Sequence, residues 1–514
     1  MENNYLLSLL ILIPLIGGVL LLFFKKGNDK AIKYFGLIVS LLVFVVSLIV
    51  YAGFDKNISE FQFIEKYNWI KNLNISYHIG IDGMSLLLVL LTTFITPLTL
   101  ISSWSSIDKK VKEFTFFMLM LEVGMLGVFL SLDLFLFYIF WEAMLIPMYF
   151  IIGIWGGEQR IYASIKFFIY TMFGSLLMLV AIIWLAVYAS TPLGHFSTNL
   201  LELYSVGPTV QREIQNYMFL AFAFSFAIKV PLFPLHTWLP DAHVQAPTAG
   251  SVILAAVLLK MGTYGLLRFC LPLFPQAAIH YAPVISVLAV IGIIYGALVA
   301  MVQKDMKKLV AYSSVAHLGF VVLGIFAVTQ ESIQGAIIQM INHGLSTGAL
   351  FLLVGVIYER THSREISDYG GIAKIVPVYS FALLFASLSS VGLPGLNGFV
   401  GEFLILLGSF KSSVLNSWWY TVFAALGVIF AAVYLLWMYQ RVVFDEVKHE
   451  KLHSLKDMNS REIFVLVPIF IFVVWIGIYP STFLNISDKT SANIIKQVNN
   501  PAKLNIKQVI DNAK

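Results

Sequence analysis

The sequence predicts an all-α, polytopic membrane protein of about 14 transmembrane helices, with two inverted five-helix repeats and broken helices in spans 7 and 12. Of its 514 residues, 59% are hydrophobic and only 12% are charged, whereas soluble domains carry about 25% charged residues. The apolar residues also arrive in uncharged blocks such as Tyr5 to Phe24, and about 20 such residues span the hydrocarbon core of a bilayer.

A hydropathy window moved along the chain finds the spans in order. They are expected at residues 5–24, 32–53, 79–101, 114–131, 133–154, 161–188, 217–240, 245–271, 278–301, 309–328, 332–358, 375–410, 418–441 and 462–483. The connectors, of which the longest are 54–78, 189–216 and the tail 484–514, are too short to form a separate soluble domain. We therefore expect residues 1–514 to form a single membrane domain.

Several kinds of site are excluded by composition. The single cysteine, Cys270, allows no internal disulfide and no iron–sulfur cluster, which needs four thiolates. No Gly-x-Gly-x-x-Gly turn marks a dinucleotide site, and a net charge of +5 is too small for this length to indicate a nucleic-acid partner. We expect no cofactor and no metal in this chain.

Lysine and arginine placement predicts the orientation, because these residues resist translocation. With the amino terminus outside, the inner connectors hold most of them: Lys25, Lys26, Lys30, Lys33, Lys109, Lys110, Lys112, Arg160, Lys304, Lys307, Lys308, Arg360, Arg364, Lys374, Arg441, Lys448, Lys451, Lys456 and Arg461. An even number of spans then places both termini on the outer side. The lysines of the carboxy-terminal tail go against this trend.

Ionisable residues lie within seven of the predicted spans. They are Glu122, Glu142, Lys229, Lys260, His317, His343 and Glu402. A charge at a helix centre costs roughly 2.5–3.5 kcal/mol on insertion, so such residues usually face the bundle interior and mark an ion or proton path. Helical spacing supports an inward direction for His343, since Gln339, Ser346 and Thr347 share its face.

Each residue also has a structural interpretation. A single membrane histidine usually bridges helices by hydrogen bonds, and Glu142 with Lys229 could form a structural ion pair. Glu122 and Lys166 lie nearer the span ends, where snorkelling to the interface explains them. Ionisable groups on seven spans are harder to explain in this way.

The residue types suit a switchable proton relay. Burial lowers the pKa of a lysine and raises that of a glutamate, and a nearby opposite charge reverses both shifts. A Glu–Lys pair that closes and opens therefore changes its affinity for a proton, while histidine titrates near pH 7.

Two spans are interrupted by helix breakers. Pro231, Pro234 and Pro240 remove backbone donors in span 7, and Pro394 lies among glycines in span 12. Spans 4–8 (114–271) and 9–13 (278–441) then form two five-span units, which must have opposite topology because each crosses the membrane an odd number of times. Spans 1–3 (5–101) precede them and span 14 (462–483) follows.

Under this pairing, Glu142 corresponds to His317 and Lys229 to Glu402. Each repeat then holds its own ionisable pair, and Lys260 lies near the junction of the two half-paths.

Five motifs carry a family resemblance. They are "FYIFWEAMLIPMYFIIGIWGG" (137–157), "KVPLFPLHTWLPDAHVQAPTAGSVILAAVLLKMGTYGLLRF" (229–269), "DMKKLVAYSSVAHLGF" (305–320), "INHGLSTGALFL" (341–352) and "GLPGLNGFVGEF" (392–403). The chain resembles, over about residues 80–480, subunit M of bacterial proton-pumping NADH:quinone oxidoreductase (respiratory complex I) and its mitochondrial counterpart, NADH dehydrogenase subunit 4, in the Mrp antiporter-like family.

The resemblance implies roles for individual residues. The essential glutamate of the family falls on Glu142, the lysine of the broken span on Lys229, and the central lysine on Lys260. The two histidines fall on His317 and His343. The distal position, a lysine in most paralogues and a glutamate in subunit M, is Glu402 here.

The resemblance also implies a translocase subunit without redox chemistry of its own. FMN, iron–sulfur clusters and quinone are expected in partner subunits, with antiporter-like paralogues on either side in a bacterial inner membrane. An Mrp-type sodium/proton antiporter subunit is the alternative, which Glu402 disfavours. A structural spacer in the membrane arm and a membrane-bound hydrogenase subunit are two further hypotheses.

Overall fold

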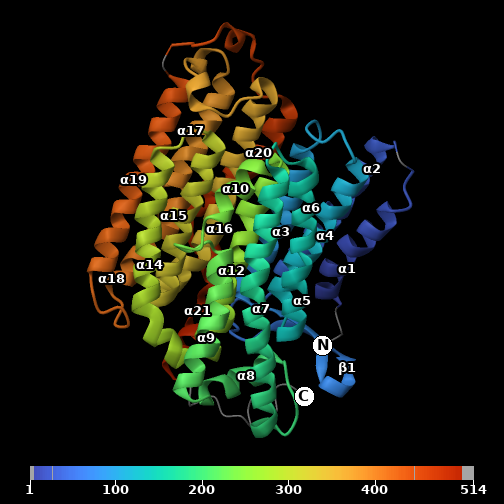
Figure 1. The fold of residues 1–514 in the computed structure, drawn as a ribbon, viewed down its shortest axis with the longest axis vertical. Helices are drawn as coiled ribbons and strands as arrows, with labels where there is room; N and C mark the ends of the chain where they lie inside the picture. The colour runs from blue at the N-terminus through green and yellow to red at the C-terminus, as the bar shows by residue number, and fades with distance from the viewer. Residues whose placement is uncertain (1–4, 26, 445, 501–514) are drawn as a thin grey trace.

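The computed structural model describes residues 5–25, 27–444 and 446–500 and is an elongated bundle of helices (Figure 1). Its longer helices are α1 (Leu6–Leu21), α2 (Asp29–Gly53), α3 (Gly83–Ser102), α4 (Val111–Leu130), α5 (Leu134–Ala143), α6 (Leu145–Trp155), α7 (Arg160–Leu193), α9 (Arg212–Lys229), α14 (Pro275–Met301), α15 (Met306–Ala327), α16 (Gln330–Thr361), α17 (Pro377–Val391), α18 (Asn397–Phe410), α19 (Trp419–Val443), α20 (Ser460–Ile478) and α21 (Ser481–Asn499). Within the described residues, 11 helical segments are long and apolar enough to cross a membrane. The polytopic helical class is thus confirmed.

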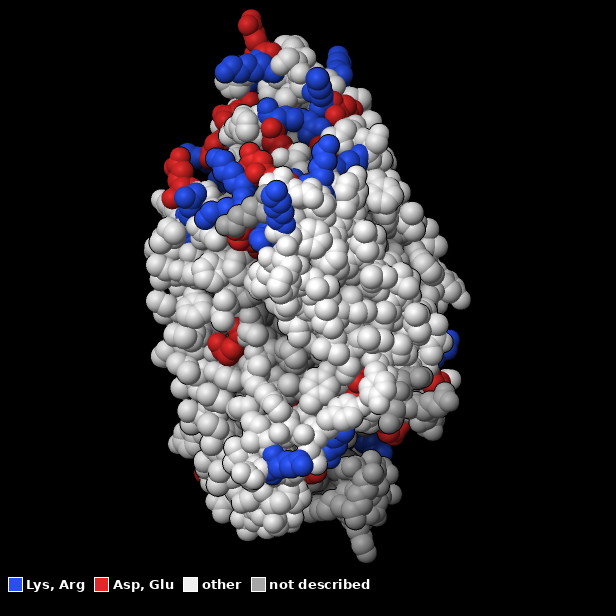
Figure 2. Space-filling model, turned by 90° about the vertical axis from the view of Figure 1, so that its right-hand side faces the viewer, with Lys and Arg blue, Asp and Glu red and all other residues white. Residues whose placement is uncertain are grey.

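Charged side chains are segregated along the bundle. Figure 2 shows them gathered at one end, with a smaller group at the other end and an almost uncharged band between, interrupted by one acidic patch. Helices such as α2 and α19 form the apolar outer surface of the bundle. In contrast, α15, α16 and the segment 248–273 are almost wholly buried. Ionisable residues on these central helices are therefore shielded by the outer helices.

The segment 248–273 is one continuous helical rod with two π-helical parts. It runs through α11 (Thr248–Ile253), the π-helical η3 (Leu254–Leu258), α12 (Leu259–Gly265), the π-helical η4 (Leu266–Cys270) and α13 (Leu271–Leu273). Single π-helical turns inside α-helices are rare and occur frequently at functional sites. They were not predicted from the sequence.

The first expected helix break is present. α9 ends at Lys229 and α10 (Trp238–Gln245) begins after an irregular stretch that contains Pro231 and Pro234. Pro240 does not contribute to the break, because it lies in the first turn of α10, where its missing N–H has no intrahelical partner to lose.

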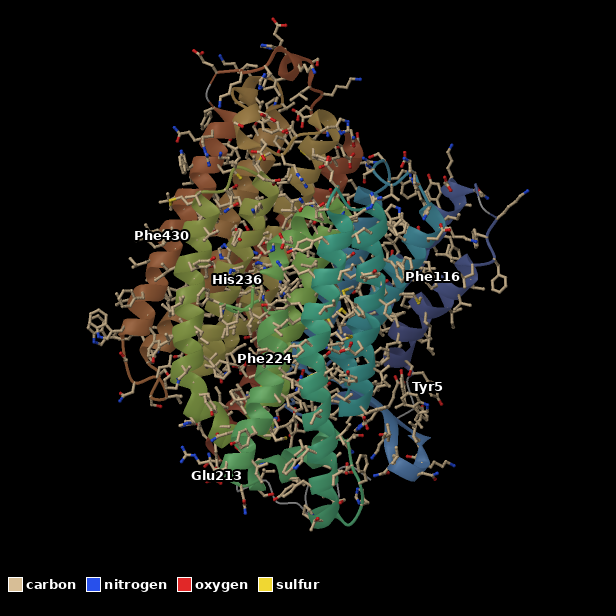
Figure 3. The ribbon with its side chains drawn as sticks, viewed as in Figure 1. Tyr5, Phe116, Glu213, Phe224, His236 and Phe430 are labelled. Carbon is tan, nitrogen blue, oxygen red and sulfur yellow. The ribbon has the colours of Figure 1, made fainter. Side chains whose placement is uncertain are left out.

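His236 lies inside this first break. Its side chain is buried, and its ring centroid is 5.8 Å from that of Phe233 and 5.1 Å from that of Tyr295. Figure 3 shows it at mid-height in the bundle, far from Glu213 at the lower end. The broken segment is therefore packed by aromatic rings.

The second expected break separates α17 from α18. It contains Pro394 together with Gly392 and Gly395, both with positive φ. Beyond the break, a Cβ atom on Gly401 would lie 2.2 Å from Gln339 Oε1. A glycine is therefore required for α18 to approach α16 this closely.

The connector expected at 54–78 is not irregular. Strand β1 (Gln62–Ile70) pairs antiparallel with β2 (Ile75–Ile81), with Tyr67 opposite Tyr77. The backbone N–H groups of Leu7 and Ser8 donate to Glu65 Oε1 at 3.0 and 3.1 Å, which fastens this hairpin to the start of α1. The span predicted from residue 79 therefore begins later, at α3.

Two connecting segments also contain helices. The segment 189–216 holds α8 (Leu200–Val206), and α21 occupies much of the tail expected at 484–514, of which residues 501–514 lie outside the described part. α21 is amphipathic, and its Ile486, Thr490, Ile494 and Val498 are buried at four-residue spacing. This helix closes one end of the bundle against α3 and α16.

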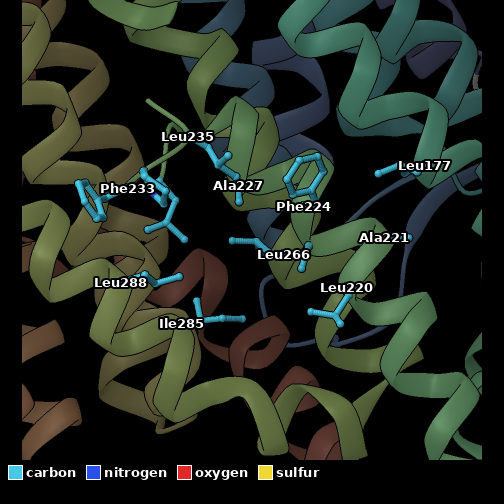
Figure 4. A pocket seen from close by; sticks show the side chains of 13 residues that line it. Leu177, Leu220, Ala221, Phe224, Ala227, Phe233, Leu235, Leu266, Ile285 and Leu288 are labelled. Carbon is cyan, nitrogen blue, oxygen red and sulfur yellow. The ribbon is translucent and has the colours of Figure 1, made fainter. Parts of the chain in front are cut away.

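An apolar cavity of about 450 Å³ lies beside the first break (Figure 4). Phe224, Phe233, Leu266 and Leu288 line it from four different segments. It also includes Leu177, which is 42% exposed on the outer surface of α7. Among the described residues, no charged side chain lines this cavity.

Candidate functional site

Lys260 lies at the centre of the bundle and is fully buried. Its Nζ is 2.6 Å from Nδ1 of His343 on α16, and it also donates to the carbonyl oxygen of Ala255 in the adjoining π-helical turn. Buried amines need such partners, because an unpaired polar group in an apolar interior is costly. The structure thus joins two of the predicted site residues directly.

His317 and Glu402 form a second buried contact. His317 Nδ1 lies 2.8 Å from Glu402 Oε1, and both side chains are 4% exposed. The other ring nitrogen of His317 is 3.2 Å from Ser390 Oγ and 3.3 Å from the Tyr434 hydroxyl. Gln339 Nε2 also donates to Glu402 Oε1 at 3.1 Å. The carboxylate is thus held by side chains from α15 and α16.

The two contacts lie next to each other. The ring centroids of His317 and His343 are 6.1 Å apart with an interplanar angle of 60°, and His343 Nε2 has no hydrogen-bond partner among the described residues. The two imidazole rings are thus neighbours in the bundle interior. Lys260, His343, His317 and Glu402 therefore form a single buried row, which we call the relay row.

Lys229 lies outside this row in an aromatic site. It is the last residue of α9, its Nζ is 3.5 Å from Met144 Sδ, and it lies 5.6 and 5.2 Å from the ring centroids of Trp141 and Phe167. The carbonyl ends of a helix attract a cation, and aromatic faces do so as well. Lys229 is therefore stabilised without a carboxylate in contact.

Glu142 and Lys229 do not form the ion pair that their structural interpretation requires. Glu142 is half-buried near the end of α5, and its Oε1 has no hydrogen-bond partner in the described part of the chain. Lys229 is near enough to interact with it electrostatically but not to form an ion pair. The interpretation of this pair as a closed structural ion pair is therefore wrong for this conformation.

The position of Glu122 also differs from the predicted one. We predicted that it snorkels to the interface, but it is fully buried in α4, and neither carboxylate oxygen has a hydrogen-bond partner within residues 5–25, 27–444 and 446–500. The prediction was wrong because residue 122 lies in the middle of helix α4, as it does in the predicted span 114–131, and neighbouring helices cover it. Lys166, for which snorkelling is also expected, is partly exposed, and its Nζ lies 2.6 Å from Asp241 Oδ2.

Two buried groups near the row were not predicted from the sequence. His243 on α10 is fully buried, neither ring nitrogen has a partner among the residues described, and the ring stacks 4.5 Å from that of Phe351. Lys307, assigned to a connector, is only 6% exposed. Helical spacing could have shown the second, because Lys307, Ser314 and His317 share one face of α15 at intervals of seven and three residues.

Within the described residues, no group of three or more histidine, cysteine, aspartate or glutamate side chains could hold a metal ion. The groups that the site brings together are amine, imidazole and carboxyl groups, which exchange protons. Broken helices beside such buried groups define an antiporter-like, polytopic membrane protein.

Comparison with known proteins specifies the class further. Residues 131–429 match the family described as NADH:quinone oxidoreductase/Mrp antiporter, transmembrane, and residues 8–132 match NADH-ubiquinone oxidoreductase chain 4, amino terminus. The chain belongs to this family of membrane subunits, in the group that contains subunit M and chain 4.

The relatives are similar over almost their whole length. The chain is 48% identical to NADH-quinone oxidoreductase subunit M of Rhodobacter capsulatus, with 96% of this chain and 97% of the relative covered. It is 44% identical to NADH-ubiquinone oxidoreductase chain 4 of Arabidopsis thaliana, with 96% and 98% covered.

Solved structures agree with this assignment. A chain of respiratory complex I from Thermus thermophilus with bound NADH superposes with a TM-score of 0.86 at 32% identity, with 96% of this chain and 99% of that chain covered. A chain of the Mrp complex from Dietzia has a TM-score of 0.84 at 18% identity, with 99% and 100% covered, which shows a shared fold alone.

Proposed function

We propose that this chain is the antiporter-like, proton-translocating membrane subunit of an NADH:quinone oxidoreductase. The observation that carries the proposal is the relay row, in which Lys260 contacts His343, His317 contacts Glu402, and the two imidazole rings are neighbours inside the bundle. NADH oxidation and quinone reduction take place in partner subunits, which hold the FMN, iron–sulfur clusters and quinone. Antiporter-like paralogues lie on either side of this chain in the membrane.

The relay row passes protons in a defined order. The ammonium of Lys260 gives its proton to His343 Nδ1, the imidazolium releases the proton at Nε2, and a bridging water delivers it toward His317. His317 then gives a proton to the carboxylate of Glu402, which releases it on the outer side. Before the next proton arrives, Lys260 regains a proton, Glu402 has lost one, and each imidazole returns to its starting tautomer by rotation of its ring, so that the accepting nitrogen is again unprotonated.

Glu142 and Lys229 act as the switch that drives the relay. In the present arrangement the amine is held by Met144 and two aromatic rings, apart from the carboxylate. When the two groups close, each stabilises the charged form of the other, and when they separate the amine releases its proton more readily. The half-buried position of Glu142 suits a group that responds to a neighbouring subunit.

The proposal includes a domain arrangement for the chain. We infer one membrane domain over residues 1–514 with 14 spans and two inverted repeats, at 114–271 and 278–441. The support is that both breaks, after α9 and after α17, lie at corresponding places in the two units. Spans 1–3 at 5–101 and span 14 at 462–483 flank the repeats.

The orientation is also inferred. We place the protein in the bacterial inner membrane with both termini on the outer, periplasmic side. The support is the lysine and arginine bias of the connectors expected on the inner side, together with the gathering of charged side chains at one end of the face that Figure 2 shows.

The proposed switch is tested in the complete, reconstituted complex. Lys229→Met and Glu142→Gln should each remove most NADH-driven proton pumping while the complex stays assembled. Lys166→Met, on the neighbouring helix α7 and partly exposed, is the matched control and should pump normally. Pumping at the wild-type rate in assembled Lys229→Met and Glu142→Gln complexes would refute the role of the switch.

A further inference from the structure

A polar cavity of about 620 Å³ opens at the charged end of the bundle. It is formed by the turns that connect α6 with α7, α14 with α15, and α16 with α17, together with the end of α10. Its polar and charged lining includes Glu158, Gln159, Asp305, Lys307, His362 and Arg364. It differs in this respect from the cavity of Figure 4, which apolar side chains line.

Lys307 lies between this cavity and the interior. It lines the cavity, yet it is only 6% exposed, and its Nζ donates to the carbonyl oxygen of Ala246 at the end of α10. A second cation, Arg364, donates to the carbonyl of Val244 at 2.6 Å and pairs with Asp305 at 3.2 Å. The end of α10 is thus fastened to the cavity wall by two basic side chains.

His243 lies on α10, one turn before Ala246. Its ring is fully buried and both nitrogens are without a partner in the described chain, although buried polar atoms are nearly always hydrogen-bonded. Its ring stacks 4.5 Å from Phe351 on α16, the helix that also carries His343, and Ala246, one turn along α10, accepts from Lys307. An unpartnered imidazole therefore lies on a helix whose end contacts Lys307, and its ring packs on the helix that carries His343.

We propose that this cavity is the proton inlet of the relay row, with Lys307 as its first carrier and His243 as the connection to Lys260. The inference rests on the proposed function and adds the side and the residues through which protons arrive. Neutral Lys307 takes a proton from a hydronium ion in the cavity, which leaves as water. The resulting ammonium gives a proton to one nitrogen of His243, and His243 gives the proton of its other nitrogen to the neutral amine of Lys260.

A purely structural role for Lys307 makes a different prediction. If its charge only stabilises the carbonyl end of α10, arginine should replace it, since arginine keeps the charge and the donors. Arginine does not release a proton in proteins. Lys307→Arg therefore separates a carrier from a structural cation.

The first test determines whether water and small solutes reach the wall of the polar cavity next to His243. Val244 lines the polar cavity and Leu177 the apolar one, while the native Cys270 is buried. In the complete complex, Val244→Cys should react with a charged, membrane-impermeant thiol reagent, and Leu177→Cys should not. Absence of labelling at Val244→Cys, or equal labelling at both positions, would overturn the inlet.

The second test measures NADH-driven proton pumping in reconstituted complexes with confirmed assembly. Lys307→Met and Lys307→Arg should both lose most of their pumping, whereas Lys308→Met, the adjacent and more exposed lysine, should pump normally. Wild-type pumping by Lys307→Arg, or an equal loss in Lys308→Met, would overturn the carrier role.

A failure of the inlet can be separated from a failure of the proposed function. Substitution of Lys260 or Glu402 should abolish pumping whichever way protons arrive. If those variants lose pumping while Lys307→Arg retains it, the inlet alone is refuted. If Lys260 and Glu402 variants pump normally, the relay row itself is refuted.

Discussion

Nδ1 of His343 lies 2.6 Å from Nζ of Lys260, so that an imidazole on α16 is the direct acceptor of an amine on the rod that carries both π-helical turns. Only one proton can lie between these two nitrogens. His343 Nε2, on the opposite side of the ring, has no hydrogen-bond partner in the part of the chain that the structure describes. The ring is therefore arranged to take a proton at one nitrogen and release it at the other.

This contact predicts strong non-additivity. Lys260→Met and His343→Gln should each reduce NADH-driven pumping sharply, and the double variant should be little worse than either single one, because each removes the same transfer step. Residues in contact couple by about 0.5–3 kcal/mol, whereas distant ones add. A double-mutant cycle of pumping rates measures the coupling.

Glu359→Gln is the control partner for Lys260→Met in the same cycle. Glu359 is partly exposed near the end of α16, where it accepts from Ser105 Oγ at 2.9 Å. That pair should be additive. Additive effects of Lys260→Met and His343→Gln would instead mean that the observed contact plays no part in transfer.

The buried ion pair between Arg268 and Asp82 should be the largest single polar contribution to stability at the end of the bundle that holds the hairpin. Its atoms are 2.6 Å apart and both side chains are 4% exposed. Asp82→Asn leaves an uncompensated buried charge and should cost about 3–5 kcal/mol of unfolding free energy. Thermal unfolding in detergent measures the loss.

The comparison pair is Lys166 with Asp241, which has the same 2.6 Å separation but side chains that are 24% and 38% exposed. Asp241→Asn should cost about 0–1 kcal/mol. Equal losses in the two variants would show that burial does not set the strength of these pairs.

Gly83 should be intolerant of any side chain. A Cβ atom there would lie 1.9 Å from the carbonyl oxygen of Ile486 on α21. Gly83→Ala should therefore displace α21, which increased protease cleavage within residues 481–499 would report. Gly348→Ala is the matched control, because the nearest atom to its Cβ would be 4.0 Å away, and it should leave cleavage unchanged.

The hairpin should lose stability in acid. Burial, with Lys66 nearby, lowers the pKa of His78 on β2 to about 4, although a hydrogen bond with Asn199 opposes the shift. The unfolded chain, with an ordinary value of about 6.5, takes up a proton between about pH 6.5 and 4 that the folded chain does not. Folded stability is therefore constant above this window and falls as the pH drops through it.

The loss should be on the order of 3 kcal/mol at most. Thermal unfolding followed from about pH 7.5 to 4.5 should show a smaller pH dependence for His78→Asn than for the unchanged chain. His280→Asn, at an exposed position, should keep the original pH dependence. An identical pH profile for His78→Asn and the unchanged chain would exclude this histidine as the source.

Much of the fold could be predicted because lipid exposure imposes long apolar runs, which α2 and α19 retain even though they carry no site residue. The breaks after Lys229 and Val391 were visible as prolines and glycines. The hairpin at 62–81, helix α21 and the π-helical turns could not be predicted from the sequence. They depend on tertiary contacts such as Glu65 with the start of α1, which no local pattern reports.

The residues of the site could be predicted from the sequence, but the contacts between them could not. Charge within an apolar run identified Lys260, His317, His343 and Glu402, which the structure brings together. The partner of each group depended on helix packing. Hence Lys229 contacts Met144 rather than Glu142, and His243 was overlooked because one histidine in a proline-containing stretch carries no distinct signal.

The central claim, that the relay row carries protons, is tested most directly at its last member. Glu402→Gln keeps an oxygen for His317 and Gln339 but cannot ionise. We predict that reconstituted complexes with this substitution show little NADH-driven proton uptake per assembled complex, while Glu359→Gln complexes match the unchanged protein. Uptake at the unchanged rate in assembled Glu402→Gln complexes would contradict the account.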